Sequence, residues 1–230
     1  MQGKMIYGVG GLIIGLVAGF FAANSLNRQS AVTASSTSVV NPTDGAASSG
    51  NAQQPGGMQF DVARTLEKAE AEPNNFVAQM QAGDMYAQIG RFEKAIEFYL
   101  KGVALDPQSA PANIVLANAY FDSQKFEDAE KYYAKALEID PKNVNARTDL
   151  GATFVERQPP DYERGISEFR KALELDPRNA AALYYLGVAL HRKGERVQAE
   201  NTLTELEKVS PQSELAIRLR QYLNAKPTIR

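Results

Sequence analysis

The chain has 230 residues, and its 25 lysine and arginine residues nearly balance its 27 aspartate and glutamate residues. Nucleic-acid binding normally shows as a basic excess or a basic stripe, and the sequence has neither. It has no cysteine and a single histidine, His191, which excludes disulfides, thiolate metal sites and metal sites built on two histidines. We expect no metal, no cofactor and no nucleic-acid partner.

The first zone, residues 1–28, contains an apolar stretch of 19 residues, Met5–Ala23, that carries no charge. As a helix this stretch would be about 28 Å long, close to the hydrocarbon thickness of a bilayer. It therefore predicts a transmembrane anchor. A cleaved signal peptide is the alternative, with a weak cleavage pattern at Ala23-Asn24-Ser25.

Three glycines of this stretch recur every four residues, on one face of the expected helix: Gly11, Gly15 and Gly19. Such spacing permits close approach of two helices in a membrane, so it suggests a homodimer through this segment. The alternative is that glycine is simply common in membrane helices.

Basic residues give a weak signal for orientation. Lys4 precedes the apolar stretch, Arg28 follows it, and the next basic residue is Arg64. By the positive-inside rule this slightly favours a cytoplasmic amino terminus. The rest of the chain would then be extracytoplasmic, in the periplasm of a bacterium.

The second zone, residues 29–58, is rich in Ser, Thr, Ala, Asn, Gly, Gln and Pro, with one acid and no aromatic residue. A segment of this kind cannot bury enough apolar area to offset the loss of chain entropy. We expect a disordered linker between the anchor and the rest of the chain.

From residue 59 onward, prolines recur at a nearly fixed interval. Prolines follow one another at intervals of 34, 34, 36 and 34 residues: Pro73, Pro107, Pro141, Pro177 and Pro211. Because proline disfavours helix in the residue before it, each should end a helix. Two residues after each proline stands a strong N-cap residue for the next helix: Asn75, Ser109, Asn143, Asn179 and Ser213.

Small and large residues also recur in register within this region. The small slots hold Ala95, Ala129, Gly165 and Ala199, and the large slots four residues later hold Tyr99, Tyr133, Phe169 and Leu203. This 34-residue helix–turn–helix unit resembles the tetratricopeptide repeat. The sequence departs from that family's pattern in having no tryptophan and in placing Gln124 where the second unit should have a turn glycine.

The resemblance implies an all-α fold, an α-solenoid in which helix–turn–helix repeats stack into a right-handed superhelix. We expect a transmembrane anchor over 1–28, a disordered linker over 29–58, a capping helix over 59–75, repeats over 76–107, 110–141, 144–177 and 180–211, and a capping helix with a tail over 212–230. The third repeat carries two extra residues at Pro159 and Pro160, which should bulge as a surface loop.

The resemblance further implies a concave groove lined mainly by the first helix of each repeat. Several of the corresponding residues are apolar or aromatic, with acidic spots that favour a partner of some basic character. Ordinary packing between repeats is the alternative role for any one of them. The inward positions are Val77, Met80, Asp84, Ile114, Asn118, Phe121, Asp122, Thr148, Val155, Tyr184, Val188, His191 and Arg192, with Asp149 as a third acidic spot.

Some tetratricopeptide proteins hold carboxyl-terminal peptides in a clamp of lysine, arginine and asparagine. Of the corresponding positions here only Asn118 agrees, whereas Met80, Asn145 and Asp149 do not, so we expect no such clamp. The sequence also lacks a nucleophile elbow, a phosphate-binding glycine loop and a recognisable acid–base pair, so we expect no enzyme and no catalytic residue.

The sequence as a whole favours a membrane-tethered adaptor that binds segments of other proteins. The arrangement loosely resembles bacterial membrane-anchored repeat proteins of envelope assembly, including cytochrome c maturation factors. The alternative is a homo-oligomeric structural scaffold of the envelope that has no peptide client.

Overall fold

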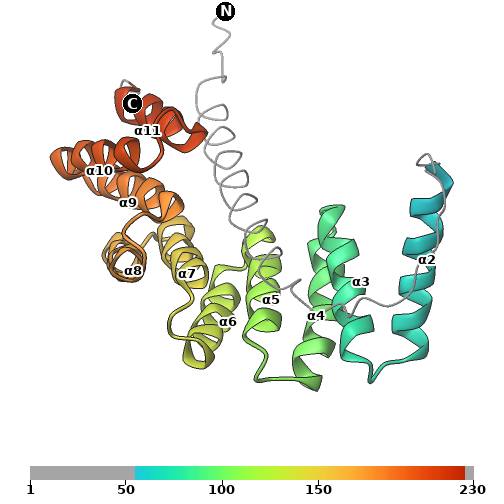
Figure 1. Cartoon of the computed structure of the whole chain (residues 1–230). Helices are drawn as coiled ribbons and strands as arrows, with labels where there is room; N and C mark the ends of the chain where they lie inside the picture. The colour runs from blue at the N-terminus through green and yellow to red at the C-terminus, as the bar shows by residue number, and fades with distance from the viewer. Residues whose placement is uncertain (1–54, 226–230) are drawn as a thin grey trace, which may run out of the picture. The chain divides into compact units, whose positions relative to one another are not determined.

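The computed structural model describes residues 55–225 of the chain, with side chains from Val62 onward. In this range the chain forms ten α-helices and no strand (Figure 1). The described residues fall into two compact units, which we call the N-terminal unit (55–161) and the C-terminal unit (162–225). The predicted anchor, Met5–Ala23, lies outside the described residues, and so does the predicted linker as far as residue 54.

The helices follow the predicted repeats along the chain. The N-terminal unit contains α2 (Pro55–Ala71), α3 (Phe76–Gln88), α4 (Phe92–Leu105), α5 (Ala110–Asp122), α6 (Phe126–Ile139) and α7 (Val144–Glu156). The C-terminal unit contains α8 (Tyr162–Leu175), α9 (Ala180–Lys193), α10 (Arg196–Val209) and α11 (Glu214–Asn224). No helix between residues 55 and 225 combines the length and the apolarity needed to cross a bilayer.

Helix α2 begins at Pro55, four residues before the boundary that the composition suggests. Proline is well suited to the first turn of a helix, where its missing N–H would have no partner in any case. Helices α3, α5, α7 and α9 are the first helices of the four repeats, and α4, α6, α8 and α10 are the second helices.

The predicted N-caps are confirmed in all five places. At the start of α3, the Asn75 side chain accepts a hydrogen bond from the Ala78 N–H at 3.1 Å, and Asn143 does the same for Ala146 at 2.9 Å. Ser109, Asn179 and Ser213 cap α5, α9 and α11 in the same way. Each cap satisfies one amide that would otherwise lack a partner, which fixes where the four first helices and the capping helix α11 begin.

In the first, second and fourth repeats, the turn between the two helices uses a left-handed residue. Gly90 has φ +72° and Gly194 has φ +93°, a conformation open to glycine at little cost. Gln124 adopts the same conformation, with φ +60°, in the second repeat. The missing turn glycine therefore leaves the turn in place and makes a non-glycine residue adopt a strained backbone conformation.

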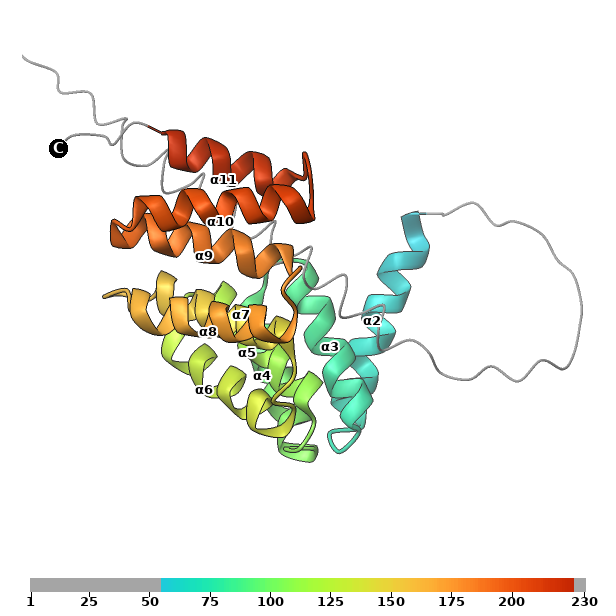
Figure 2. The same cartoon turned by 60° about the vertical axis from the view of Figure 1, so that its left-hand side comes forward.

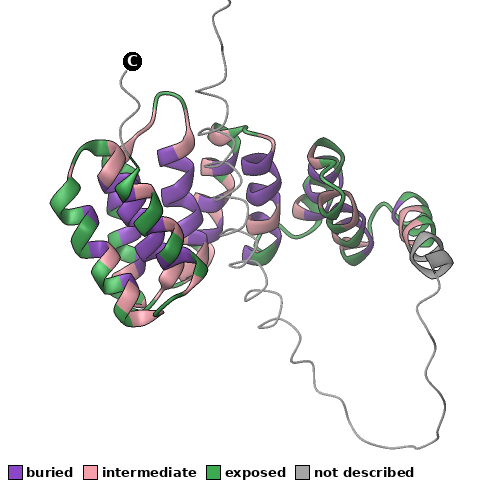
Figure 3. Cartoon of the chain, turned by 90° about the horizontal axis from the view of Figure 1, so that it is seen from above, coloured by how far each residue is buried: buried purple, intermediate pink, exposed green. Residues whose placement is uncertain are grey.

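Alternating small and large side chains hold the helices of the N-terminal unit together. Ala69 of α2, Ala78 and Ala82 of α3 and Phe98 of α4 form one buried cluster. A Cβ atom added at Gly83 would lie 2.4 Å from the Tyr99 ring, so glycine lets α3 and α4 approach closely. Figure 3 shows burial on the helix sides that face other helices and exposure at the turns.

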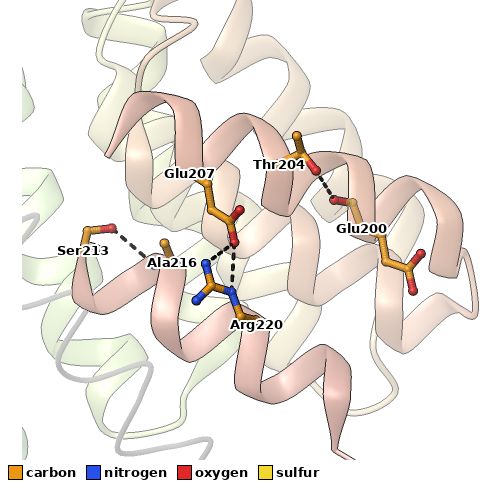
Figure 4. Close-up of polar contacts among 6 residues, drawn as sticks. All are labelled: Glu200, Thr204, Glu207, Ser213, Ala216 and Arg220. Carbon is orange, nitrogen blue, oxygen red and sulfur yellow. Dashed lines mark hydrogen bonds and ion pairs between the residues drawn. The ribbon is translucent and has the colours of Figure 1, made fainter. Parts of the chain in front are cut away.

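The C-terminal unit repeats this scheme and ends in a capping helix. Helices α9, α10 and α11 pack side by side (Figure 2). Leu219 of α11 is fully buried and lies against Gly187 of α9, as expected for a helix that covers the last repeat. On the exposed side of α11, the Arg220 guanidinium donates to the Glu207 carboxylate of α10 at 2.7 and 3.1 Å (Figure 4).

The two-residue insertion forms an exposed loop between α7 and α8, as predicted, with Gln158 and Pro159 at the surface. The loop is held to the N-terminal unit at both ends. The Arg157 guanidinium lies 3.3 Å from the Glu130 carboxylate, and the Asp161 N–H donates to the Phe154 carbonyl at 2.8 Å.

Candidate peptide-binding faces

Helix α3 leaves one side uncovered. Val77, Gln81, Asp84 and Gln88 are exposed and follow one another at intervals of four, three and four residues, which places them on one face of the helix. We call these four residues the α3 stripe. Val77 is 56% exposed, so the stripe presents a large apolar side chain to water. The stripe therefore combines one apolar contact with amide and carboxylate groups that can form hydrogen bonds.

The other sides of α3 are fixed by contacts with its neighbours. The fully buried Gln79 donates from its Nε2 to the Ala69 carbonyl at 2.6 Å and the Glu72 carbonyl at 3.3 Å, which ties α3 to the end of α2. Half-buried Met80 lies over Gly102 of α4, where its Sδ occupies the space of a Cβ atom. These contacts determine which side of α3 is left for the stripe.

Asp84 is held in place by a residue of the second helix. The Tyr99 hydroxyl donates a hydrogen bond to Asp84 Oδ1 at 2.6 Å, and Tyr99 itself is buried. Partial burial of the carboxyl group raises the pKa of Asp84 from its ordinary value, and the hydrogen bond from Tyr99 offsets part of this rise. The Asp84 residue as a whole is exposed, so water still screens its charge.

The second repeat contains the same link with an amide in place of the carboxylate. The Tyr133 hydroxyl donates to Asn118 Oδ1 at 2.5 Å, and both residues are buried. On the same helix, Ile114 is half-buried, and Phe121 and Asp122 are buried. The Phe121 ring packs edge-on against Phe126 at 5.3 Å between ring centroids.

Helix α7 places its predicted groove residues among packed side chains. Thr148, Asp149 and Val155 are all buried. The Thr148 hydroxyl donates to the Val144 carbonyl at 2.9 Å, so this polar group is satisfied within its own helix.

In the C-terminal unit, the predicted residues of α9 are aromatic, aliphatic and basic. Tyr184 and Val188 are buried, and Tyr184 packs edge-on against Tyr185 at 5.2 Å. His191 and Arg192 are half-buried near the end of α9, and the His191 ring lies edge-on to Tyr222 of α11 at 5.2 Å. The predicted residues of this unit therefore differ in charge from those on α3.

The structure thus divides the predicted groove residues by exposure, and their contact with a partner stays a prediction. Val77 and Asp84 are exposed, and Met80, Ile114, His191 and Arg192 are half-buried. The remaining predicted residues are buried: Asn118, Phe121, Asp122, Thr148, Asp149, Val155, Tyr184 and Val188. The predicted transmembrane packing glycines, Gly11, Gly15 and Gly19, lie outside the described residues.

Sequence reasoning missed Gln81 and Gln88 of the α3 stripe and the part that Tyr99 plays in holding Asp84. A regular spacing in the sequence could have revealed the hydrogen bond between Tyr99 and Asp84. Asp84 and Asn118 each precede a tyrosine by fifteen residues, and the same spacing in the fourth repeat joins two apolar residues, Val188 and Leu203. A polar residue paired in this way with a tyrosine predicts a hydrogen bond between the two helices of a repeat.

Two family models match the described part of the chain. A TPR repeat model matches residues 83–121, and the model of the cilia and flagella-associated protein 70 middle TPR-like domain matches residues 113–221. The chain is a tetratricopeptide-repeat protein. A comparison with curated protein sequences finds no match.

Several solved structures are similar to this chain, and those of MamA share its fold. A crystal structure of MamA is 24% identical, with a TM-score of 0.61 over 67% of this chain and 90% of that one. MamA from Desulfovibrio magneticus RS-1 is 22% identical, with a TM-score of 0.62 over 67% and 88%. The second TPR domain of human RPAP3, in complex with an HSP70 peptide, is 27% identical with a TM-score of 0.46 over 50% and 98%.

Tetratricopeptide repeats are protein-interaction domains without enzymatic chemistry of their own. Within residues 55–225, no group of three histidine, aspartate or glutamate side chains could hold a metal ion.

Proposed function

We propose that the chain is an adaptor whose repeats bind segments of other proteins on the faces of their first helices. The exposure of Val77 beside Asp84 on the α3 stripe carries this proposal. An apolar contact combined with a placed charge supplies both affinity and register to a docked segment. The buried tetratricopeptide framework behind the stripe keeps these groups in position before a partner arrives.

We further propose that Met5–Ala23 anchors the chain in a membrane and that the linker lets the repeats move away from the bilayer. The length and apolarity of the stretch support the anchor, and the low apolar content of residues 29–54 supports the tether. The repeats would then lie outside the cytoplasm and take part in the assembly or maturation of envelope proteins.

Two exposed valines allow a matched test of peptide binding. Val77 lies on the first helix α3, and Val197, which is 71% exposed, lies on the second helix α10. The full chain in lipid nanodiscs is presented with a library of displayed peptides, and the affinity of the selected binders is measured. We expect Val77→Asp to weaken binding at least tenfold, because a carboxylate would replace the apolar contact, and Val197→Asp to leave it unchanged.

Two results of this test would contradict the adaptor function. One is a library that yields no binder to the full chain. The other is an equal effect of the two substitutions, which would place binding away from the first helices. Thermal unfolding of both variants, followed by circular dichroism, checks that each keeps the helical fold of the parent chain.

The tether is tested separately in cells. We expect the full chain to remain in the membrane fraction after alkaline carbonate extraction, and a chain without Met5–Ala23 to be soluble. Added protease should reach the repeats only from the outer side of the membrane. A full chain that is extracted by carbonate, or protected from protease on that side, would refute this part of the proposal.

A homo-oligomeric scaffold is the second candidate, favoured by the spacing of Gly11, Gly15 and Gly19. It predicts a detergent-solubilised full chain of dimeric or larger mass that becomes monomeric with Gly15→Ile and selects no peptide. A monomer that selects peptides favours the adaptor instead.

A further inference from the structure

We propose that Asp84 is the charge-selecting residue of the α3 stripe and that it takes a lysine or arginine of an apolar partner segment. This inference rests on the proposed function and specifies the chemistry of the partner. It concerns α3 and α4 of the N-terminal unit alone.

The α3 stripe carries one negative charge. Asp84 is the single charged residue of α3, so no basic side chain on this helix compensates its carboxylate. Three uncharged residues surround it on the stripe: Val77, Gln81 and Gln88. A partner segment that lies along the stripe therefore meets apolar and amide groups and one negative charge.

Asp84 is held in one orientation by Tyr99. The Tyr99 hydroxyl donates a hydrogen bond to Asp84 Oδ1 at 2.6 Å, and Tyr99 is itself buried. The carboxylate is therefore oriented before a partner binds, and Oδ2 remains on an exposed residue to accept a hydrogen bond from a cation. A preoriented acceptor loses little side-chain entropy on binding, unlike a flexible surface glutamate.

An exposed apolar side chain lies on the same face of α3 as this charge. Val77 lies two helical turns before Asp84 on the same face, and it is more than half exposed. An apolar side chain of the partner can pack on Val77 while a lysine or arginine further along the same segment reaches the Asp84 carboxylate. The partner that fits is thus an apolar segment with a basic residue about two helical turns from its apolar anchor.

The second repeat supplies a variant that removes the charge and keeps the framework. There an asparagine, Asn118, accepts the hydrogen bond from Tyr133 in the place that Asp84 has relative to Tyr99. Asp84→Asn should therefore retain the link between the two helices and lose only the negative charge. Glu93→Gln is the matched control, because Glu93 is an exposed carboxylate of the second helix α4.

The test uses the full chain in nanodiscs and a displayed library of short peptides with randomised central positions. We expect peptides selected by the parent chain and by Glu93→Gln to be enriched in lysine and arginine, and those selected by Asp84→Asn to lack this enrichment. The tightest parent binder is then made with a tryptophan, since the chain contains none, and its affinity is followed by tryptophan fluorescence. Replacing its central lysine by glutamine should weaken binding to the parent about fivefold to tenfold, and to Asp84→Asn less than twofold.

The outcomes separate this inference from the proposed function. Binders without basic enrichment, or a lysine effect that is equal in the parent and in Asp84→Asn, would overturn the role of Asp84 while leaving peptide binding intact. A library that yields no binder would overturn both. Amide hydrogen exchange of α3 and α4 in Asp84→Asn, expected to match the parent, verifies that loss of selection follows from loss of charge.

Discussion

The hydrogen bonds that Tyr99 and Tyr133 donate between the two helices of a repeat should differ in strength, because their acceptors differ in exposure. Tyr133 is fully buried, and its acceptor Asn118 is 7% exposed, whereas Tyr99 donates to Asp84 at the surface. Removing either hydroxyl with Tyr133→Phe or Tyr99→Phe keeps the aromatic ring. The two substitutions therefore compare the loss of one hydrogen bond in two settings.

The magnitudes follow from what happens to the acceptor. A buried hydrogen bond contributes about 1 kcal/mol net, and leaving its acceptor buried and unpaired costs about 1 kcal/mol more. Tyr133→Phe should thus lower the free energy of local opening of α5 and α6 by about 2 kcal/mol. In Tyr99→Phe, water reaches the Asp84 carboxylate in place of the lost hydroxyl, so the loss should be about 0.5 kcal/mol.

Amide hydrogen exchange resolves these losses repeat by repeat, which a single melting curve of a repeat array does not. We expect exchange of the α5 and α6 amides in Tyr133→Phe to be about thirtyfold faster than in the parent chain, and that of α3 and α4 in Tyr99→Phe about twofold faster. Equal acceleration in the two variants, or a smaller effect of Tyr133→Phe, would refute the reasoning from acceptor burial.

Three further predictions concern charge, backbone and caps. Burial raises the pKa of Asp84 in the folded chain, so protonation of Asp84 is more favourable there than in the unfolded chain. The stability that this group contributes is therefore present below the unfolded pKa and lost as pH rises through the folded pKa. Asp84→Asn should flatten this pH dependence of stability in denaturant titrations, and an unchanged profile would contradict the prediction. Gln124→Gly should stabilise the chain by about 0.5–1 kcal/mol, because glycine adopts the left-handed conformation of Gln124 without strain. Gly90→Ala, at a residue in the same conformation, should destabilise the chain by about 1 kcal/mol in the same denaturant titrations. Changes of the same sign in the free energy of unfolding would refute the strain at Gln124. Asn143→Ala should cost about 1 kcal/mol through loss of the α7 cap, measured by hydrogen exchange of the first turn of α7, and no change there would show that the cap contributes little.

The sequence was most informative where structure is decided locally and repeated at a fixed interval. The cap at Asn143 recurs at equivalent positions of the neighbouring repeats, so the spacing of the chain was enough to predict it. Tyr162 begins α8 as Phe92 begins α4. The spacing also predicts this aromatic position, although two residues are inserted before it.

Exposure of the candidate binding residues was less predictable, since it depends on contacts between helices. Thr148 occupies a position equivalent to groove residues of other repeats, and yet it is fully buried and bonded to its own helix. Gln81 has no property in the sequence that separates it from other surface glutamines, and its place in the α3 stripe follows only from how α2 and α4 cover the rest of α3. The link between Tyr99 and Asp84 depends on side-chain geometry that residue types alone leave open.

Site-specific photo-crosslinking in the native membrane tests most directly whether the first helices bind other polypeptides. The crosslinking amino acid is placed at Gln81 of the α3 stripe or, as the control, at Gln108, an exposed residue of the turn between α4 and α5. The account predicts discrete crosslinked polypeptides from Gln81 that diminish with Val77→Asp, and none from Gln108. Equal products from both positions, or none from Gln81, would contradict it.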